Sequence, residues 1–364
     1  MRDKLIQLGI NALKQVSRSY ILPIWQVKVE TTKVCNLKCI GCRRNFAETL
    51  SKMSGPKHLT VGGLWRIVAT TNMQIVRFEG DGEPTCNPYF RDLVKFCHDK
   101  GIRSAMTSNG TLLDKEYIKW LEDHEMVRIH ISFDGATRET FEKQRVGAKY
   151  DQVLEVCREI GKSKIQLFMN CLCSTDEIVK ELPDYIDMAR EVGATGILML
   201  KFQADKSFGT PIDWSKHNGL LEEIKEKAKK KDLIFIGTGT TVPIFCECED
   251  VYVCPYVTLT GAVYPCSYIA NMRTSEVYQG EVVPVPSENY IMGNLTDNWM
   301  REIWKNEDYK ELRMVLKKTR KPSGYKISKE ELLSAKKIIS QWGEEANRFQ
   351  YCVGCLCRWG ESGL

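Results

Sequence analysis

The stretch WQVKVETTKVCNLKCIGC, residues 25–42, joins a strand-like run to a loop that holds three cysteines. In the strand-like run Val27 and Val29 alternate with Lys28 and Glu30, the pattern of a β-strand with one apolar and one polar face. In the loop the cysteines follow a Cys-x3-Cys-x2-Cys spacing. A closed structural zinc site has four ligands, so this loop predicts a metal centre with an open position or a zinc site completed from elsewhere.

Strand-like and helix-like runs alternate from residue 25 to about residue 203. Two of the helix-like segments, YFRDLVKFCHDKG (89–101) and EIVKELPDYIDMAREVG (177–193), are amphipathic and end at glycine, a usual helix stop. Repeated strand–helix units predict an α/β fold, and six units predict an open, partial (β/α)6 barrel of the TIM type. The expected strands are residues 25–31, 75–80, 102–108, 127–134, 165–173 and 196–202.

The polar face of these strands determines what the barrel can hold. Trp25, Val27 and Val29 should face the helices, and the intervening residues should then face the interior. A polar interior offers space for a charged ligand and a polar substrate; the alternative is that these strands are half-exposed and their polar side chains meet water. The predicted interior set is Gln26, Lys28, Glu30, Arg77, Glu79, Arg128, His130, Ser132 and Asp134.

Composition narrows the functional class. The chain of 364 residues has 52 Lys and Arg against 47 Asp and Glu, and the net charge of +5 is too small to predict a nucleic-acid binder. It has no apolar run of membrane-spanning length and no signal peptide, so we expect a cytoplasmic protein without a transmembrane segment. Residues 1–24 should form an N-terminal helix, which leaves no room for a separate leader-peptide-binding domain.

Fifteen cysteines in such a chain are not explained by disulfides. Three lie in the loop at 35–42 and seven lie between residues 246 and 357. Two groups of thiols predict two metal-binding regions. The other five should be ordinary packing residues: Cys86, Cys97, Cys157, Cys171 and Cys173.

The cysteine spacing and its context, ETTKVCNLKCIGCRR (30–44), resemble the radical S-adenosylmethionine (SAM) enzyme family. The resemblance implies that Cys35, Cys39 and Cys42 bind three irons of a [4Fe–4S] cluster, while SAM chelates the fourth iron through its amino and carboxylate groups. This explains why the loop stops at three cysteines. It also implies that a reductant such as flavodoxin or ferredoxin supplies one electron, which cleaves SAM to methionine and a 5′-deoxyadenosyl radical.

Further segments resemble the motifs of that family, each at the end of an expected strand. GDGEPT (80–85) is similar to the Gly-Gly-Glu-Pro motif that binds the methionyl amino group of SAM, with Asp81 in place of the first glycine. TSNGTLL (107–113) and ISFDGATRETFEKQR (131–145) continue the series, and Asn170 follows on the fifth strand, with Cys171 and Cys173 on the opposite face. The implied SAM-binding residues are Gly82, Glu83, Pro84, Ser108, Asn109, Ser132, Asp134, Arg145 and Asn170.

The C-terminal cysteines resemble the SPASM/Twitch extension of some radical SAM enzymes, which binds auxiliary [4Fe–4S] clusters. The supporting pattern is Cys254, then Gly261-x4-Cys266, GNL (293–295) and a terminal Cys-x2-Cys pair. Seven thiols cannot fully ligate two cubanes, so one complete auxiliary cluster is expected; a second with an open iron, or structural zinc, are the alternatives. The candidate ligands are Cys248, Cys254 and Cys266, completed from Cys352, Cys355 and Cys357.

We therefore predict a radical SAM partial barrel at 25–210, a connecting helix or linker at 211–245, and a small cysteine-rich α+β auxiliary-cluster domain at 246–364. The implied reaction is hydrogen abstraction from an unactivated C–H bond, with an auxiliary cluster assisting an oxidative modification. The leading expected substrate is a peptide or protein side chain. The alternatives are a sugar or aminocyclitol substrate, and a non-enzymatic iron–sulfur electron carrier.

Overall fold

The structure is a computed structural model that describes part of the chain. The described residues are 23–42, 44, 55–201, 212, 214–217, 219–237, 250–270, 275–278, 281–284 and 287–318. Residues 1–22 of the expected N-terminal helix lie outside these ranges, as do Cys248, Cys352, Cys355 and Cys357.

A curved parallel sheet forms the first part of the fold, and all six expected strands are present in it. Each strand pairs in parallel with the next one along the chain. This order confirms the predicted partial barrel. The strands are β1 (Gln26–Glu30), β2 (Ile75–Glu79), β3 (Arg103–Ser108), β4 (Met126–Ser132), β5 (Gln166–Cys173) and β6 (Gly196–Lys201).

A seventh strand, β7 (Ile234–Gly237), pairs in parallel with β6 and was not predicted. It follows helix α10 (Leu220–Lys230), within the segment that we expected to be only a connection. The α10–β7 unit therefore extends the strand–helix repeat past residue 210. Its sequence IFIG is only four residues long, and so short an apolar run does not distinguish a strand from a connection.

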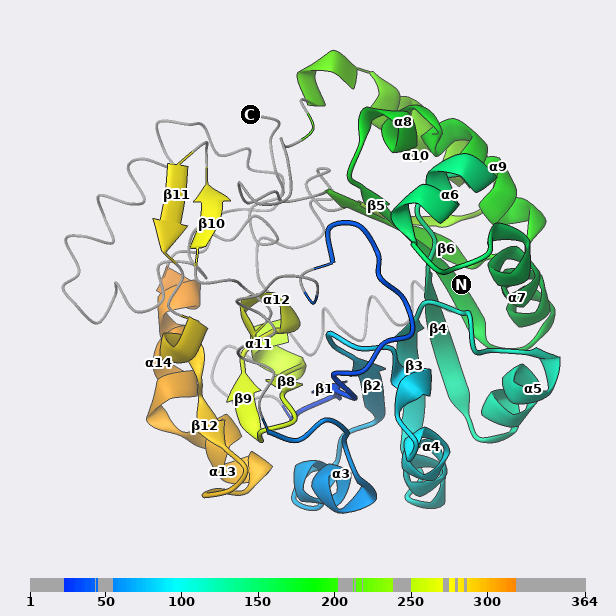
Figure 1. The fold of residues 1–364 in the computed structure, drawn as a ribbon. Helices are drawn as coiled ribbons and strands as arrows, with labels where there is room; N and C mark the ends of the chain where they lie inside the picture. The colour runs from blue at the N-terminus through cyan, green and yellow to red at the C-terminus, as the bar shows by residue number, and fades with distance from the viewer. Residues whose placement is uncertain are drawn as a thin grey trace.

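Helices cover the outer face of the sheet (Figure 1). Side chains of Thr60, Asp114 and Thr137 accept backbone hydrogen bonds at three helix starts, which satisfies donors that the helix itself leaves unpaired. The helix expected at 177–193 is in fact divided, because Pro183 lies in the first turn of the second piece. The helices are α3 (Val61–Val68), α4 (Phe90–Asp99), α5 (Lys115–Asp123), α6 (Arg138–Gln144), α7 (Tyr150–Lys162), α8 (Asp176–Lys180) and α9 (Leu182–Glu191).

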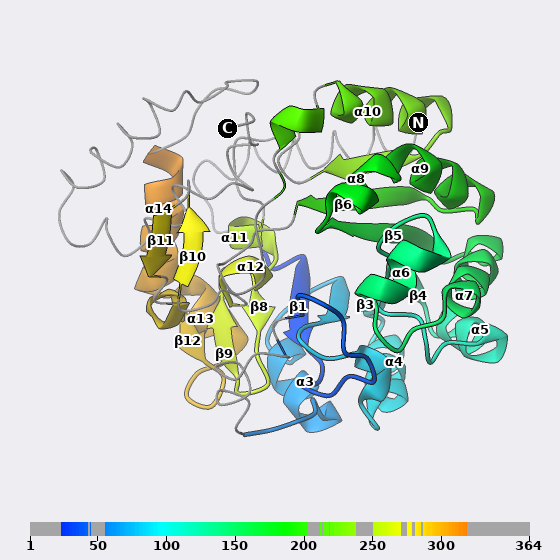
Figure 2. The same ribbon diagram turned by 45° about the horizontal axis from the view of Figure 1, so that its top comes forward.

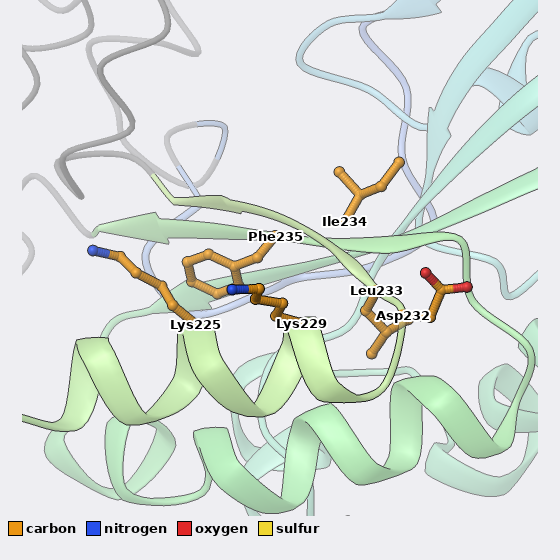
Figure 3. Close-up of a pocket in the computed structure, with 6 residues that line it drawn as sticks. All are labelled: Lys225, Lys229, Asp232, Leu233, Ile234 and Phe235. Atoms are coloured by element: carbon orange, nitrogen blue, oxygen red, sulfur yellow. The ribbon is translucent and has the colours of Figure 1, made fainter. Parts of the chain in front are cut away.

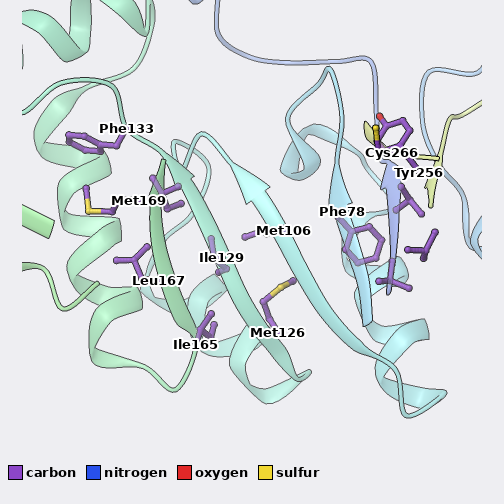
Figure 4. Close-up of a cluster of buried hydrophobic side chains, with 14 of the residues drawn as sticks. Phe78, Met106, Met126, Ile129, Phe133, Ile165, Leu167, Met169, Tyr256 and Cys266 are labelled. Atoms are coloured by element: carbon purple, nitrogen blue, oxygen red, sulfur yellow. The ribbon is translucent and has the colours of Figure 1, made fainter. Parts of the chain in front are cut away.

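The apolar side chains of the strands form the core between sheet and helices, as their alternation predicts. Val27, Val29 and Phe78 are fully buried. Phe78, Met106, Ile129 and Met169 project from neighbouring strands (Figure 4). Trp25 is an exception: it precedes β1 and is 49% exposed, so its assignment to the helix-facing set was wrong.

The C-terminal elements extend the same sheet on the other side of β1 (Figure 2). Strand β8 (Tyr256–Val257) pairs in parallel with β1, and β9 (Ala262–Tyr264) and β12 (Gly293–Asn294) follow in antiparallel order. This short-strand, short-helix composition agrees with the expected α+β class. The remaining elements are α11 (Asp250–Val253), α12 (Ser267–Ala270), β10 (Ser275–Tyr278), β11 (Glu281–Pro284), α13 (Met300–Lys305) and α14 (Glu307–Lys318).

Candidate active site

The three-cysteine loop leaves the carboxyl end of β1, the edge at which parallel α/β sheets bind their ligands. Backbone hydrogen bonds fix it against the end of α6: Lys38 donates to Val146 at 3.0 Å and Ile40 donates to Gln144 at 2.9 Å. The backbone N–H of Cys42 donates to the carbonyl oxygen of Cys39 at 3.2 Å. Backbone hydrogen bonds therefore hold the loop in place.

The thiols of this loop are half-buried and affect one another. Burial raises the pKa of both Cys35 and Cys39, and the neighbouring Cys42 raises both further. Iron favours the thiolate and overcomes this shift. No three His, Cys, Asp or Glu side chains of the described ranges converge on a single metal ion. A [4Fe–4S] cluster does not need such convergence, because each thiolate binds a different iron.

The Gly82–Glu83 turn packs directly on the cysteine loop. Gly82 donates its N–H to the carbonyl oxygen of Thr32 at 3.0 Å, and Glu83 donates to that of Val34 at 2.8 Å. A Cβ atom at Gly82 would lie 2.3 Å from the Thr32 oxygen and 2.4 Å from the Val34 oxygen. Only glycine fits this close approach, so the turn and the loop form one unit.

Glu83 joins its own turn to the end of β3. Its Oε1 accepts hydrogen bonds from the hydroxyls of Thr85 and Ser108 at 2.7 and 2.8 Å, and its Oε2 accepts from the Asn109 N–H at 2.6 Å. Burial raises the pKa of this carboxyl group, and the same hydrogen bonds oppose the shift. The structure thus brings together Glu83, Ser108 and Asn109, and Pro84 begins the short 3-10 helix η2 (Pro84–Cys86) beside them.

Asn36 and Cys86 belong to this site, and the sequence analysis did not place them there. Asn36 accepts from Asn109 Nδ2 at 3.0 Å and donates to Thr111 Oγ1 at 2.7 Å, which links the cysteine loop to β3. The Cys86 thiol is half-buried and lies 3.7 Å from Asn36 Oδ1, next to the cysteine loop. The only available signal was the position of each residue next to a motif, directly after Cys35 and two residues after Pro84.

Asp134 and Arg145, both predicted to contact SAM, form an ion pair with each other. Arg145 Nε lies 2.7 Å from Asp134 Oδ2, and Asp134 Oδ1 accepts the N–H of Leu172 at 2.7 Å. Burial lowers the pKa of Arg145, but the charges of Asp134 and Cys39 outweigh this effect and raise it. The guanidinium is therefore a fixed cation beside the cysteine loop.

Asn170 lies on the interior face of β5, and its Oδ1 is 3.0 Å from Nδ1 of His130. Ser132, at the end of β4, pairs with Asn170 across the sheet. Cys171 and Cys173 are completely buried, as are Cys97 and Cys157. Burial raises the pKa of Cys97 to about 12, which is typical of an inert packing thiol.

The auxiliary cysteines lie at the opposite end of β1. The backbone N–H of Trp25 donates to Val253 at 3.0 Å, and Gln26 Nε2 donates to the Cys254 sulfur at 3.3 Å. Cys266 follows β9, which runs antiparallel to β8, so it returns to the same end of the sheet. The five residues of β1, which span about 13 Å at about 3.3 Å per residue, lie between the two thiol regions.

The residues present fit iron–sulfur clusters at both ends. Thiolate is the soft ligand that selects such clusters, and the described ligands of each region are cysteines. The close contact at Gly82 also brings the Glu83 turn next to the cysteine loop. Both segments can therefore contact the same cofactor. Cys35, Cys39 and Cys42 would hold the SAM-binding cluster, and Cys254 and Cys266 would contribute to an auxiliary one.

A separate pocket of about 330 Å³ lies between α10 and β7, at the far edge of the sheet (Figure 3). None of the predicted site residues lines it. Its lining residues are Lys225, Lys229, Asp232, Leu233, Ile234 and Phe235.

Comparisons with known proteins agree with this geometry. The family model of the radical SAM superfamily matches residues 29–189, and that of the SPASM iron–sulfur cluster-binding domain matches residues 246–327. The AdoMet-dependent heme synthase of Methanosarcina barkeri is 25% identical over 82% of this chain and 85% of its own length. The mycofactocin maturase MftC of Mycobacterium tuberculosis is 22% identical over 83% of this chain and 75% of its own length.

The fold is also that of a solved structure. The crystal structure of Streptococcus suis SuiB bound to S-adenosylmethionine superposes with a TM-score of 0.64, at 14% identity, over 91% of this chain and 75% of that one. SuiB bound to its precursor peptide SuiA superposes with a TM-score of 0.57, at 13% identity, over 83% and 72%. Among the described helices none is long and apolar enough to span a membrane. The chain belongs to the radical SAM superfamily: it is a radical SAM enzyme whose cofactors are SAM, the SAM-binding [4Fe–4S] cluster and the auxiliary clusters of a C-terminal SPASM domain.

Proposed function

We propose that this enzyme abstracts a hydrogen atom from an unactivated C–H bond of a peptide or protein side chain, and that the auxiliary cluster assists an oxidative outcome. The observation that carries the proposal is the placement of two thiol regions at opposite ends of β1. A substrate between them would meet the radical source on one side and an electron acceptor on the other. A reductant such as flavodoxin or ferredoxin would supply the first electron.

The chain's own residues supply the positioning that this reaction needs. Bound SAM and its cluster supply the 5′-deoxyadenosyl radical. Gly82 allows the close contact that fixes the cofactor site, and Glu83 holds Ser108 and Asn109 at its rim. Asp134 fixes the cationic side chain of Arg145, which suits a carboxylate such as that of SAM.

Two relatives support a peptide substrate, because MftC is named as a maturase and SuiB has been solved with a precursor peptide. A second candidate is a small, cofactor-like molecule, favoured by the heme synthase that matches most of this chain. The sugar or aminocyclitol alternative stays a prediction.

The test uses the anaerobically reconstituted full chain, reduced in the presence of SAM. A deuterium-labelled cell extract is added, and deuterium transfer into 5′-deoxyadenosine is measured by mass spectrometry. We expect transfer that is lost when the extract is first digested with protease. Transfer that survives digestion would instead favour the small-molecule candidate, and absence of SAM cleavage would contradict the proposed function itself.

A further inference from the structure

The interior face of the sheet carries an excess of cations at the level of the strand midpoints. Lys28 of β1 pairs in register with Arg77 of β2, and Arg128 of β4 lies at the same level. The carboxylates on this face of β1 and β2, those of Glu30 and Glu79, lie two residues nearer the carboxyl ends, so no described carboxylate of β1 to β5 lies at the level of these three cations. Arg77 pairs with Glu79 at 2.9 Å, which leaves the balance around Arg128 positive.

Arg128 has neutral partners only. Its Nε and Nη2 donate to Gln166 Oε1 at 3.1 and 2.9 Å, and its guanidinium carbon lies 5.1 Å from the ring centroid of Phe168. No carboxylate of the described chain pairs with it. Burial and the nearby charge of Arg77 both lower the pKa of Arg128. A half-buried guanidinium beside a second one, and without a counter-ion, attracts an anion.

His130, two residues further along the same face, offers a hydrogen-bond acceptor that no described residue uses. The residue is 4% exposed, and its ring stacks on Phe168 with the ring centroids 5.0 Å apart. Burial and the charges of Arg77, Arg128 and Lys28 hold the pKa of His130 well below its usual range, so the ring is neutral.

In the neutral ring, Nδ1 carries the proton that it donates to Asn170 Oδ1, and Nε2 is left as an acceptor. Nε2 is buried and has no hydrogen-bond partner among the residues that the structure describes. A buried acceptor without a donor costs free energy, which a ligand with an N–H or O–H group would recover.

We propose that this interior site binds an oxyanion of the substrate: Arg128 donates to the oxyanion, and Nε2 of His130 accepts a hydrogen bond from a neighbouring O–H or N–H of the same molecule. The inference rests on the proposed function and narrows its substrate to an acid, either a carboxylate or a phosphate. The SAM-binding residues lie at the carboxyl ends of the strands, and Cys254 lies beside the first residue of β1. The proposed site lies between these two levels. An acid anchored there would lie between the two clusters.

The experiment measures binding of three probes, succinate, malate and inorganic phosphate, to the anaerobically reconstituted full chain by calorimetry. Saturating SAM occupies its own site throughout. We expect Arg128→Gln to weaken binding of the preferred probe about tenfold or more, because a charge-assisted hydrogen bond is lost. Arg128→Lys keeps the charge and should retain most of the affinity. Arg158→Gln, on the outer helix α7, is the matched control and should leave the affinity unchanged.

The hydroxyl of malate adds the donor that His130 lacks. Wild type should therefore prefer malate to succinate, and His130→Phe, which keeps a ring beside Phe168, should remove that preference. Tighter binding of the dicarboxylates indicates a carboxylate substrate, and tighter binding of phosphate indicates a phosphorylated one.

Two results would overturn the inference: no saturable binding of any probe to wild type, or equal affinities of wild type and Arg128→Gln. SAM cleavage by the wild type is measured separately. Cleavage without anion binding contradicts only this inference, whereas absence of cleavage contradicts the proposed function.

Discussion

The two thiol regions at the ends of β1 are held in different ways. Cys35, Cys39 and Cys42 are half-buried in a loop, surrounded by polar residues that belong to several strand ends. Cys254 and Cys266 are buried, 4% and 8% exposed, beside strands of the sheet itself. The first region is open because a ligand as large as SAM must enter. The second is enclosed, as suits a centre that exchanges electrons, because burial and hydrogen bonds to sulfur set its potential.

The largest effect, on both iron content and SAM cleavage, is expected from removing the three thiols of the open region. The triple variant Cys35→Ala, Cys39→Ala, Cys42→Ala should lose one cubane, about four irons per chain, and its SAM cleavage should fall below detection. Iron and sulfide analysis and 5′-deoxyadenosine measurement check this. Cys157→Ala, which removes a fully buried packing thiol, is the control and should keep the wild-type iron content. A triple variant with unchanged iron would contradict the assignment of the loop.

The enclosed region should behave in the opposite way. Cys254→Ala with Cys266→Ala should lose at least one cubane while the SAM-binding cluster remains, so that SAM is still cleaved. Mössbauer spectroscopy of the reconstituted protein distinguishes the two cluster populations. If this variant instead lost both clusters and cleaved no SAM, the two regions would not be independent.

The contact between the cysteine loop and the Glu83 turn can be tested by adding one methyl group at Gly82. Gly82→Ala should lower the free energy of unfolding by about 1–3 kcal/mol and weaken SAM binding, because the new Cβ meets two backbone oxygens. Gly62→Ala is the matched control: its Cβ meets nothing closer than 3.9 Å, and alanine favours helix α3 by about 0.5–1 kcal/mol. Anaerobic urea unfolding measures both. Equal stability of the two variants would show that the close approach is absent.

A smaller effect is expected on the reduction potential of the auxiliary cluster in the enclosed region. Gln26→Leu removes the hydrogen bond to the Cys254 sulfur and should lower the reduction potential of the auxiliary cluster. A hydrogen bond of about 0.5–1.5 kcal/mol corresponds to about 20–60 mV for one electron. Redox titration followed by electron paramagnetic resonance measures the shift. Gln74→Leu is the control, because the side-chain Nε2 of Gln74 donates to the Asn72 carbonyl oxygen and not to a sulfur. An equal shift in both variants would remove the role assigned to Gln26.

The smallest effect is the pH response of His130. Because its pKa is lowered in the folded protein, the unfolded chain takes up the proton first, and stability falls as the pH drops below about 6.5. Nitrogen-15 spectra should show a neutral ring with the proton on Nδ1 at pH 6 and above. His130→Gln assigns the signal and should reduce the loss of stability. A midpoint near 6.5 in the folded protein would contradict the burial of this ring.

The sequence predicted what depends on local pattern. The succession of strand-like and helix-like runs predicted the six strands, and the cysteine spacing with GDGEPT located the loop and its partner turn. Strand β7 was not predicted, because its four residues are too short an apolar run to be distinguished from a connection. The sequence did not predict the positions of Asn36 and Cys86 or the Gln26–Cys254 contact. Each of these depends on how segments that are distant in the sequence pack together. Gln26 and Cys254 are 228 positions apart, and only the pairing of β1 with β8 brings them together.

The central claim is that one cluster has an iron open to SAM while the enclosed cluster does not. Electron paramagnetic resonance of the reduced, anaerobically reconstituted protein, recorded with and without SAM, tests it most directly. The account predicts that SAM changes the signal of one cubane and leaves a second signal unaltered. A spectrum that is identical with and without SAM would contradict it.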